Sequence, residues 1–591
     1  MIAGDNEKLP DPKELEKEIG EFLSKKFGDN VKVISPLVMS EEELPDKTDK
    51  APPKKKKLDF DLKPEELVAY LDQYIVKQDR AKTVLATKIC THFNRVKRRE
   101  AFPDDHKEIV GSIKNNVLML GPTGVGKTYL VKLIADKIGV PFVKGDATKF
   151  SETGYVGGDV EDLIRDLVRE ADGDIESARH GIIYIDEIDK IASSHNLIGA
   201  DVSRTGVQRA LLKPMEETDV ELKVPHDPIS MMEEIEQYRK TGKRDKRYVN
   251  TKNILFIMSG AFANIGEIIK KRISKQNIGF GAKIKRSDED SDILKHLKTE
   301  DLVKFGFESE FVGRLPVRAV FERLTEDDLF NILRNPNNPI ILGKKLDFEA
   351  YDINVKFEDK ALRILAEQAF SENTGARGLV SAVEEALLFF EEKLPSTTIK
   401  KFPITSSVIE NPQKALETFL ATQNDKKWDK IFERIAHQEK QRVKEYIKSK
   451  QKNLAERYHL RLSESQTDLV AAYYCNHITD IGEAMQKIKF YYDEVKKLEL
   501  YFLNKHDINI ILEEDAMDLI TEQFINSSAT FENIYKKISA DFEDGLKLIQ
   551  GKTGRNRFPI TREALLDPKS FLNDLVKKEL GIDPIPDNSK F

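Results

Sequence analysis

GPTGVGKT, at residues 121–128, fixes the architecture of the chain around it. The stretch matches the pattern G-x-x-x-x-G-K-[ST] at every specified position. The apolar run VLML (117–120) before it has the length of a buried strand, and YLVKLIADKI (129–138) after it has helical periodicity. A strand, a glycine-rich loop and a helix in this order bind nucleotide phosphates, a context that a chance glycine-rich turn would lack.

The residue types of this loop explain the expected chemistry. Glycines let successive backbone N–H groups point inward at phosphate oxygens, and the helix N-terminus adds the positive end of its dipole. Lys127 supplies a cation for the β- and γ-phosphates, and the Thr128 hydroxyl can ligate Mg²⁺. We expect the whole loop to contact the nucleotide: Gly121, Pro122, Thr123, Gly124, Val125, Gly126, Lys127 and Thr128.

A second apolar run, IIYIDEID (182–189), ends in two acids. Asp186 can hold Mg²⁺ together with Thr128, and Glu187 can orient and activate the attacking water. Strand ends often carry acids into turns, so this signal is weak alone and gains its meaning from the phosphate loop. Having both acids predicts hydrolysis and not binding alone.

Strand-length apolar runs recur from about residue 62 to 325 and predict the fold class. PFVKG (141–145), NILFIMS (253–259) and VRAVF (317–321) lack strict alternation, as do strands buried on both faces of a parallel sheet. Helix-periodic stretches lie between them. The expected fold is therefore α/β, a parallel sheet flanked by helices, followed by a small α-rich domain.

The C-terminal third repeats the small domain. DINVKFEDKALRILAEQ (352–368) aligns with DINIILEEDAMDLITEQ (507–523), and FPITSSVIENP (402–412) aligns with FPITREALLDP (558–568). The predicted organisation is an N-terminal segment 1–39, a linker 40–61, a large ATPase domain 62–325, a small domain 326–412, a helical arm 413–504 and a degenerate duplicate of the small domain 505–591.

Composition narrows the class of protein. The 591 residues include 40% hydrophobic residues and carry a net charge of −7, which excludes wholesale disorder and argues against a nucleic-acid partner. Two cysteines far apart, Cys90 and Cys475, exclude a disulfide framework, and no zinc is expected. No apolar run reaches the roughly 18 residues of a membrane span, and no secretory signal is visible, so we expect a cytoplasmic protein without membrane contact.

Residues 62–412 resemble the AAA+ ATPases, and within them the ClpX unfoldase family. YIVKQDRAKTVLA (74–86) resembles the adenine-side segment, with Ile75 and Val76 as contacts and Lys77 where a glycine is usual. ILFIMSGAF (254–262) resembles the sensor-1 strand with Ser259, and TGARGL (374–379) the sensor-2 motif with Arg377. The resemblance implies that these residues bind ATP and that Lys127, Asp186 and Glu187 act in catalysis.

The same resemblance implies three roles besides ATP binding and catalysis. EFVGRLP (310–316) carries Arg314 as an arginine finger for the neighbouring subunit, which requires an oligomer, expected to be a hexamer. GYVG (154–157) places Tyr155 and Val156 in an axial channel, where the alternative is an ordinary turn. Ile278, Gly279 and Phe280 would dock on a ClpP-type peptidase, where the alternative is a loop packed on its own domain.

The expected function is an ATP- and Mg²⁺-dependent ring-forming unfoldase that threads protein substrates and delivers them to that peptidase. No protease motif is apparent in the chain itself. The alternatives are a remodeller that works without a peptidase and a nucleotide-gated scaffold; a DNA motor is disfavoured. The family's zinc-binding N-terminal domain has no match, and the second pore loop within 200–212 departs from the family pattern. The duplicate has Glu532 in place of Arg377, so it should bind no nucleotide.

Overall fold

The computed structural model describes most of the chain: residues 60–102, 114–150, 159–193, 202–222, 248–276, 293–422, 426–526 and 530–580. Tyr155 and Val156 of the predicted pore loop lie outside the described residues. So do Ile278, Gly279 and Phe280 of the predicted docking loop. The expectations for these five residues therefore stay predictions.

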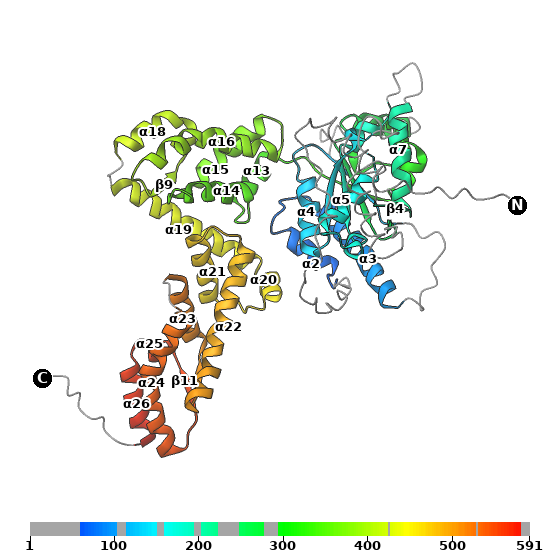
Figure 1. The fold of residues 1–591 in the computed structure, drawn as a ribbon. Coiled ribbons are helices and arrows are strands. Elements are labelled where there is room, and N and C mark those ends of the chain that lie inside the picture. The colour runs from blue at the N-terminus through cyan, green and yellow to red at the C-terminus, as the bar shows by residue number, and fades with distance from the viewer. Residues whose placement is uncertain are drawn as a thin grey trace, which may run out of the picture.

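A five-stranded parallel sheet forms the centre of the large domain (Figure 1). Its strands, in spatial order, are β2 (Phe142–Asp146), β3 (Ile182–Asp186), β6 (Leu255–Gly260), β1 (Val117–Leu120) and β7 (Val317–Val320). The predicted α/β class with a parallel sheet is confirmed.

Alternate residues of the strands enter two different hydrophobic cores. Val117 and Met119 of β1 pack with the N-terminal helices, whereas Leu118 and Leu120 pack with helices on the opposite face. Because both faces are covered, the strands read as continuous apolar runs and not as alternating ones. The helices of this domain are α2 (Pro64–Leu71), α3 (Asp79–Ala101), α4 (Lys127–Ile138), α5 (Asp162–Glu170), α6 (Ile175–Ala178), α7 (Val202–Met215), α9 (Ile265–Gln276), α11 (Thr299–Phe305) and α12 (Ser309–Gly313). A short antiparallel pair, β4 (Asp219–Glu221) and β5 (Tyr248–Asn250), lies beside them.

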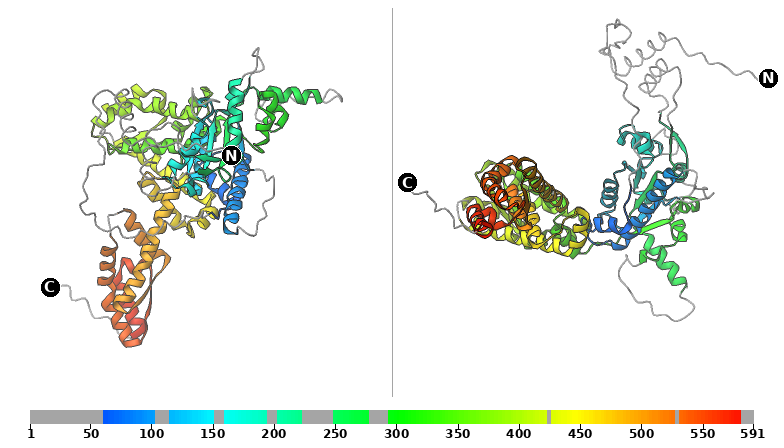
Figure 2. Two further views of the ribbon diagram at one scale, coloured as in Figure 1. Left: turned by 45° about the vertical axis from the view of Figure 1, so that its right-hand side comes forward. Right: turned by 90° about the horizontal axis from the view of Figure 1, so that it is seen from below.

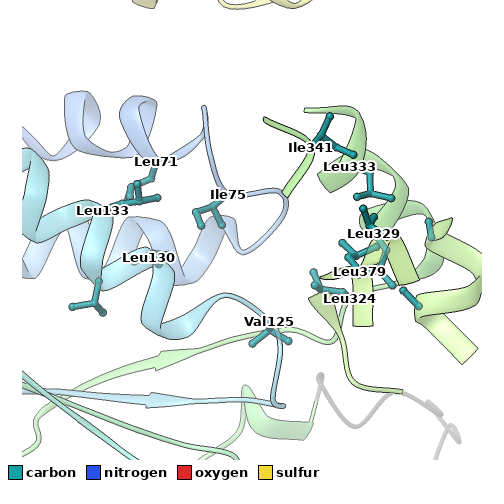
Figure 3. Close-up of a cluster of buried hydrophobic side chains, with 14 of the residues drawn as sticks. Leu71, Ile75, Val125, Leu130, Leu133, Leu324, Leu329, Leu333, Ile341 and Leu379 are labelled. Carbon is teal, nitrogen blue, oxygen red and sulfur yellow. The ribbon is translucent and has the colours of Figure 1, made fainter. Parts of the chain in front are cut away.

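The small domain begins where Thr325 caps the next helix by accepting a hydrogen bond from the Asp328 N–H. Its elements are α13 (Glu326–Arg334), α14 (Pro339–Glu349), β8 (Asn354–Phe357), α15 (Asp359–Ser371), α16 (Ala376–Lys393), β9 (Lys401–Ile404), α17 (Ser406–Glu410) and α18 (Pro412–Ala421). Strands β8 and β9 pair in parallel. The core that starts on one face of the sheet continues into this domain, as Figure 3 shows for Leu130 and Leu133 on one side and Leu329 and Leu379 on the other.

Two helices, α19 (Lys426–Ser449) and α20 (Gln451–Tyr458), lead from the small domain to a C-terminal unit (Figure 1). The unit consists of α21 (Glu464–Asn476), α22 (Ile481–His506), β10 (Asn509–Leu512), α23 (Glu514–Asn526), α24 (Phe531–Thr553), β11 (Arg557–Ile560), α25 (Arg562–Leu566) and α26 (Pro568–Leu580). Figure 2 shows that this unit extends away from the α/β domain in both further views.

The C-terminal unit has the element order of the small domain. Strands β10 and β11 pair in parallel, as β8 and β9 do, and α25 and α26 start 156 residues after α17 and α18 (406 to 562, 412 to 568). The equivalence extends upstream, because α21 and α22 precede β10 as α13 and α14 precede β8. The structural repeat thus includes helices from the stretch 413–504 that the sequence assigned to the arm.

Among the described helices, none combines the length and the apolar composition required to cross a membrane.

Candidate nucleotide-binding site

The loop 121–126 joins the carboxyl end of β1 to the first residue of α4, as the motif predicts. Gly124 and Gly126 have φ angles of 72° and 90°, which side-chain-bearing residues rarely adopt. Gly124 also lies against the small domain, where an added Cβ would be 2.1 Å from the carbonyl oxygen of Thr374. Glycine at this position therefore meets both a backbone and a space requirement.

Lys127 lies inside the loop that precedes it. Its Nζ donates hydrogen bonds of 2.7 Å to the carbonyl oxygens of Gly121 and of Pro122. Burial lowers the pKa of Lys127 to about 8, although the carboxylates of Asp186 and Asp189 oppose this shift. A phosphate entering the loop would exchange two carbonyl partners of the ammonium for anionic oxygens, which favour its charged form.

A chain of hydroxyl groups connects the phosphate loop to the acids at the end of β3. The Tyr184 hydroxyl lies 3.0 Å from Thr128 Oγ1 and 2.6 Å from Ser259 Oγ, and Ser259 donates a 2.7 Å bond to Asp186 Oδ1. Tyr184 and Ser259 are fully buried. These hydrogen bonds hold the Thr128 hydroxyl beside the Asp186 carboxylate, with 3.4 Å between Thr128 Oγ1 and Asp186 Oδ2.

The two acids at the end of β3 have different surroundings. Burial alone would raise the pKa of Asp186, but hydrogen bonds from Ser259 and Lys144 and the Lys144 charge outweigh it, and the pKa lies below its usual value. Glu187 is exposed in the cleft and has a left-handed φ of 56°. An ionised, partly buried carboxylate next to an exposed one suits a cation ligand and a water-activating base.

The small domain forms the opposite wall of a cavity of about 550 Å³. Apolar residues from the domain junction and from α13, α14 and α16 line it, namely Leu324, Ile332, Pro339, Ile340 and Val380. The N–H of Ala376, at the start of α16, donates a 2.8 Å hydrogen bond to the Gly124 carbonyl oxygen. The volume lies within the usual range for small-molecule sites.

Ile75 and Val76 line the same cavity between α2 and α3 (Ile75 is labelled in Figure 3). The following residue, Lys77, adopts a φ of 61°, so the turn that normally uses glycine is retained with a lysine. The Lys77 ammonium donates hydrogen bonds of 3.0 Å to the Arg323 carbonyl oxygen and 2.9 Å to Asp328 Oδ2. These contacts with the domain junction offset the strain of a positive φ.

Most of the nucleotide-site residues expected from the sequence line this one cavity. Thr123 to Thr128, Asp186, Glu187 and Arg377 do so, and Ser259 lies behind them, bonded to Asp186. Arg314 does not line it. Arg314 is the C-cap residue of α12, and its side chain is half-exposed. It forms an ion pair with Glu216, the residue that follows α7.

Four polar residues near the cleft were not predicted from the sequence. Tyr184 bridges Thr128 and Ser259, and Lys144 of β2 pairs with Asp186 at 3.2 Å. Asp189 accepts the N–H groups of Ala261 and Phe262, which fixes the turn after β6. Asn338 lines the cavity and caps α14. Of these, only Asp189 had a signal, as the last acid of IIYIDEID.

Comparison with known proteins identifies the family of the chain. Residues 113–318 match the family model described as AAA domain (Cdc48 subfamily), and residues 324–389 match the model described as the C-terminal, D2-small domain, of ClpB protein. The ATP-dependent Clp protease ATP-binding subunit ClpX of Treponema denticola is 42% identical to the chain over 342 residues, which cover 57% of this chain and 79% of the relative. The proteins of the same name from Borrelia duttonii and Borrelia recurrentis are each 41% identical over 357 residues, covering 59% of this chain and 78% of the relative. The chain therefore belongs to the ClpX family of AAA+ ATPases.

Proposed function

We propose that the chain is the ATP-hydrolysing subunit of a ring that unfolds proteins and passes them to a ClpP-type peptidase. The observation that carries the proposal is the single cleft that joins the phosphate loop, the Asp186–Glu187 pair and Arg377 across two domains. The relatives are named as ATP-binding subunits of the Clp protease, which supports the peptidase partner. A hexamer and a cytoplasmic location are part of the proposal.

Each cleft residue has a proposed role in ATP hydrolysis. Ile75 and Val76 contact the adenine, the loop Gly121–Thr128 wraps the phosphates, and Lys127 pairs with them. Thr128 and Asp186 would hold Mg²⁺, which when bound neutralises phosphate charge. The donor set fits this ion, because a hydroxyl and an ionised carboxylate lie 3.4 Å apart at the edge of the cavity.

The remaining roles concern water activation, signalling and traction. Glu187 takes a proton from the attacking water, and Ser259 holds Asp186 in place. Arg377 links nucleotide state to the small domain, and Arg314 serves the adjoining subunit. Tyr155 and Val156 grip the substrate by packing, with little dependence on its sequence.

Loss of the Tyr184 hydroxyl should weaken the binding of Mg²⁺ at the site. In Tyr184→Phe, Thr128 and Ser259 lose the buried partner that orients them, and changes of this kind cost about 10–100-fold in metal affinity or activity. The measurement is binding of a fluorescent ATP analogue with and without Mg²⁺, and binding without Mg²⁺ should be unchanged. Tyr492→Phe is the matched control, because the Tyr492 hydroxyl has no hydrogen-bond partner in the described part of the chain. An unchanged Mg²⁺ titration would contradict the proposed role.

Replacing Phe280 tests the peptidase partner. A tagged fluorescent protein should disappear when the chain, ATP and a ClpP-type peptidase are combined. Phe280→Ala should stop degradation while ATP hydrolysis continues, since the docking loop is separate from the cleft. Degradation by Phe280→Ala at the wild-type rate would contradict docking through this loop. Unfolding of the tagged protein by the wild type without any degradation would favour a remodeller that needs no peptidase.

A further inference from the structure

The helices α19–α22 contact the large and small domains at the two segments that border the nucleotide cleft. Tyr74 lines the cleft beside Ile75, and its hydroxyl donates a 3.3 Å hydrogen bond to Oδ2 of Asp480, the cap of α22. In the chain Asp480 lies 406 residues after Tyr74. The C-terminal part therefore contacts a wall residue of the proposed ATP site directly.

The main-chain oxygens just before Tyr74 form the centre of this contact. The Gln73 carbonyl oxygen accepts hydrogen bonds from Asn337 Nδ2 at 3.1 Å and from the Tyr446 hydroxyl of α19 at 3.3 Å. Lys450 donates a 3.3 Å bond to the carbonyl oxygen of Asp72. One loop of the large domain is thus held by the α13–α14 loop of the small domain and by the arm together.

The loop between α13 and α14 of the small domain, residues 335–338, is fixed by the same helices. Asn337 is buried, and its Oδ1 accepts a 2.9 Å hydrogen bond from the Ile481 N–H at the start of α22. The Tyr474 hydroxyl of α21 donates a 3.1 Å bond to the Pro336 carbonyl oxygen. Asn338 and the residues after it line the cleft, so this loop sets the position of the small-domain wall.

The arm is anchored firmly to the small domain. Glu439 of α19 is buried and bonds Lys345 of α14 at 2.5 Å and Lys356 of β8 at 2.6 Å. Burial opposes ionisation, but the two ammonium groups outweigh it and lower the pKa of Glu439 to about 2. Because a buried, paired charge is costly to separate, α19 and the small domain should move as one body.

We propose that Tyr446, Lys450, Tyr474 and Asp480 form a brace that positions the adenine-side segment and the α13–α14 loop for nucleotide binding. The proposal rests on the proposed ATP site. Holding both walls in place before the nucleotide arrives lowers the ordering cost of binding. Any change in the angle between the two domains must also alter the contacts with residues 72–74, so the C-terminal unit receives the nucleotide state of its own subunit.

The test uses the full-length chain with Tyr446→Phe and Asp480→Ser, alone and combined. Serine still caps α22 but cannot reach Tyr74, and phenylalanine removes the bonds to Gln73 and Asn337. Each hydrogen bond is expected to change affinity about 3–10-fold. The double variant should bind a fluorescent ADP analogue more weakly and raise the KM for ATP, with kcat within about twofold of wild type. Asp480→Asn, which keeps both the cap and a polar partner for Tyr74, should restore wild-type affinity.

The effect of ADP on amide hydrogen exchange is a second measurement. A contact that only stabilises the fold would not make this effect depend on the brace. In the wild type, ADP should increase the protection of amides in 446–458 and 481–485, and the double variant should lose this response. Asp493→Asn, on the exposed face of α22, is the control. Wild-type affinity in the double variant, or a raised kcat at unchanged KM, would overturn the brace. Absence of nucleotide binding by the wild type would instead overturn the proposed ATP site.

Discussion

Glu187→Gln should retain ATP and fail to hydrolyse it. Glu187 is exposed in the cleft next to the partly buried Asp186, where its carboxylate can accept a proton from water. Glutamine keeps the shape of the side chain but cannot accept that proton, and general-base catalysis contributes typically about 10²–10⁴-fold. The measurement is steady-state phosphate release, together with binding of a fluorescent ATP analogue that should remain at wild-type affinity.

An exposed glutamate outside the cleft is the control for this variant. Glu170→Gln, at the end of α5, removes the same charge from the surface and should leave turnover unchanged. Turnover of Glu187→Gln within about threefold of wild type would contradict its role as general base. Activation of the attacking water would then have to be assigned to another residue.

Arg314→Ala should lower kcat by about 10³-fold or more, the range in which arginine fingers act. Arg314 pairs with Glu216 and does not line its own cleft, which suits a residue that serves a neighbouring subunit. Lysine should not restore the rate, because it lacks the planar fork of guanidinium nitrogens. Arg169→Ala, a surface arginine on α5, is the control and should hydrolyse ATP normally.

A mixing experiment separates action on a neighbour from action on the same chain. Arg314→Ala subunits retain Glu187, and Glu187→Gln subunits retain Arg314. Some subunit interfaces in mixed rings therefore have both residues. Two inactive preparations should therefore regain ATP hydrolysis when mixed. Mixed rings that form and stay inactive would contradict action on the neighbouring subunit, whereas Arg314→Ala that hydrolyses ATP by itself would assign the role to another arginine.

The sequence allowed the sheet and most of the cleft to be predicted, because these features are local. GPTGVGKT and IIYIDEID each carry their own chemistry, and buried parallel strands leave continuous apolar runs. Tyr184 could not be assigned this way, because a tyrosine within an apolar run gives no sign of where its hydroxyl points. Its partners, Thr128 and Ser259, lie 56 and 75 residues away in the chain.

The repeat was predicted only in part for a similar reason. The strands and the helix after each of them kept recognisable sequence, whereas α22 has 26 residues and its counterpart α14 has 11. Because the two helices differ so much in length, their sequences do not align, although they occupy the same place in the element order. The contacts of Asp480 with Tyr74 depend on packing between distant segments, so no local pattern could reveal them.

The proposal that ATP hydrolysis drives traction on a threaded polypeptide can be tested by one measurement. A stably folded fluorescent protein with an unstructured tag is incubated with the purified chain and ATP, with and without a ClpP-type peptidase, and its fluorescence is followed over time. Wild-type chain should extinguish the fluorescence only with hydrolysable ATP, and Tyr155→Ala should hydrolyse ATP yet unfold far more slowly. Vigorous ATP hydrolysis with no loss of fluorescence, or equal unfolding by Tyr155→Ala, would contradict threading through a pore lined by this residue.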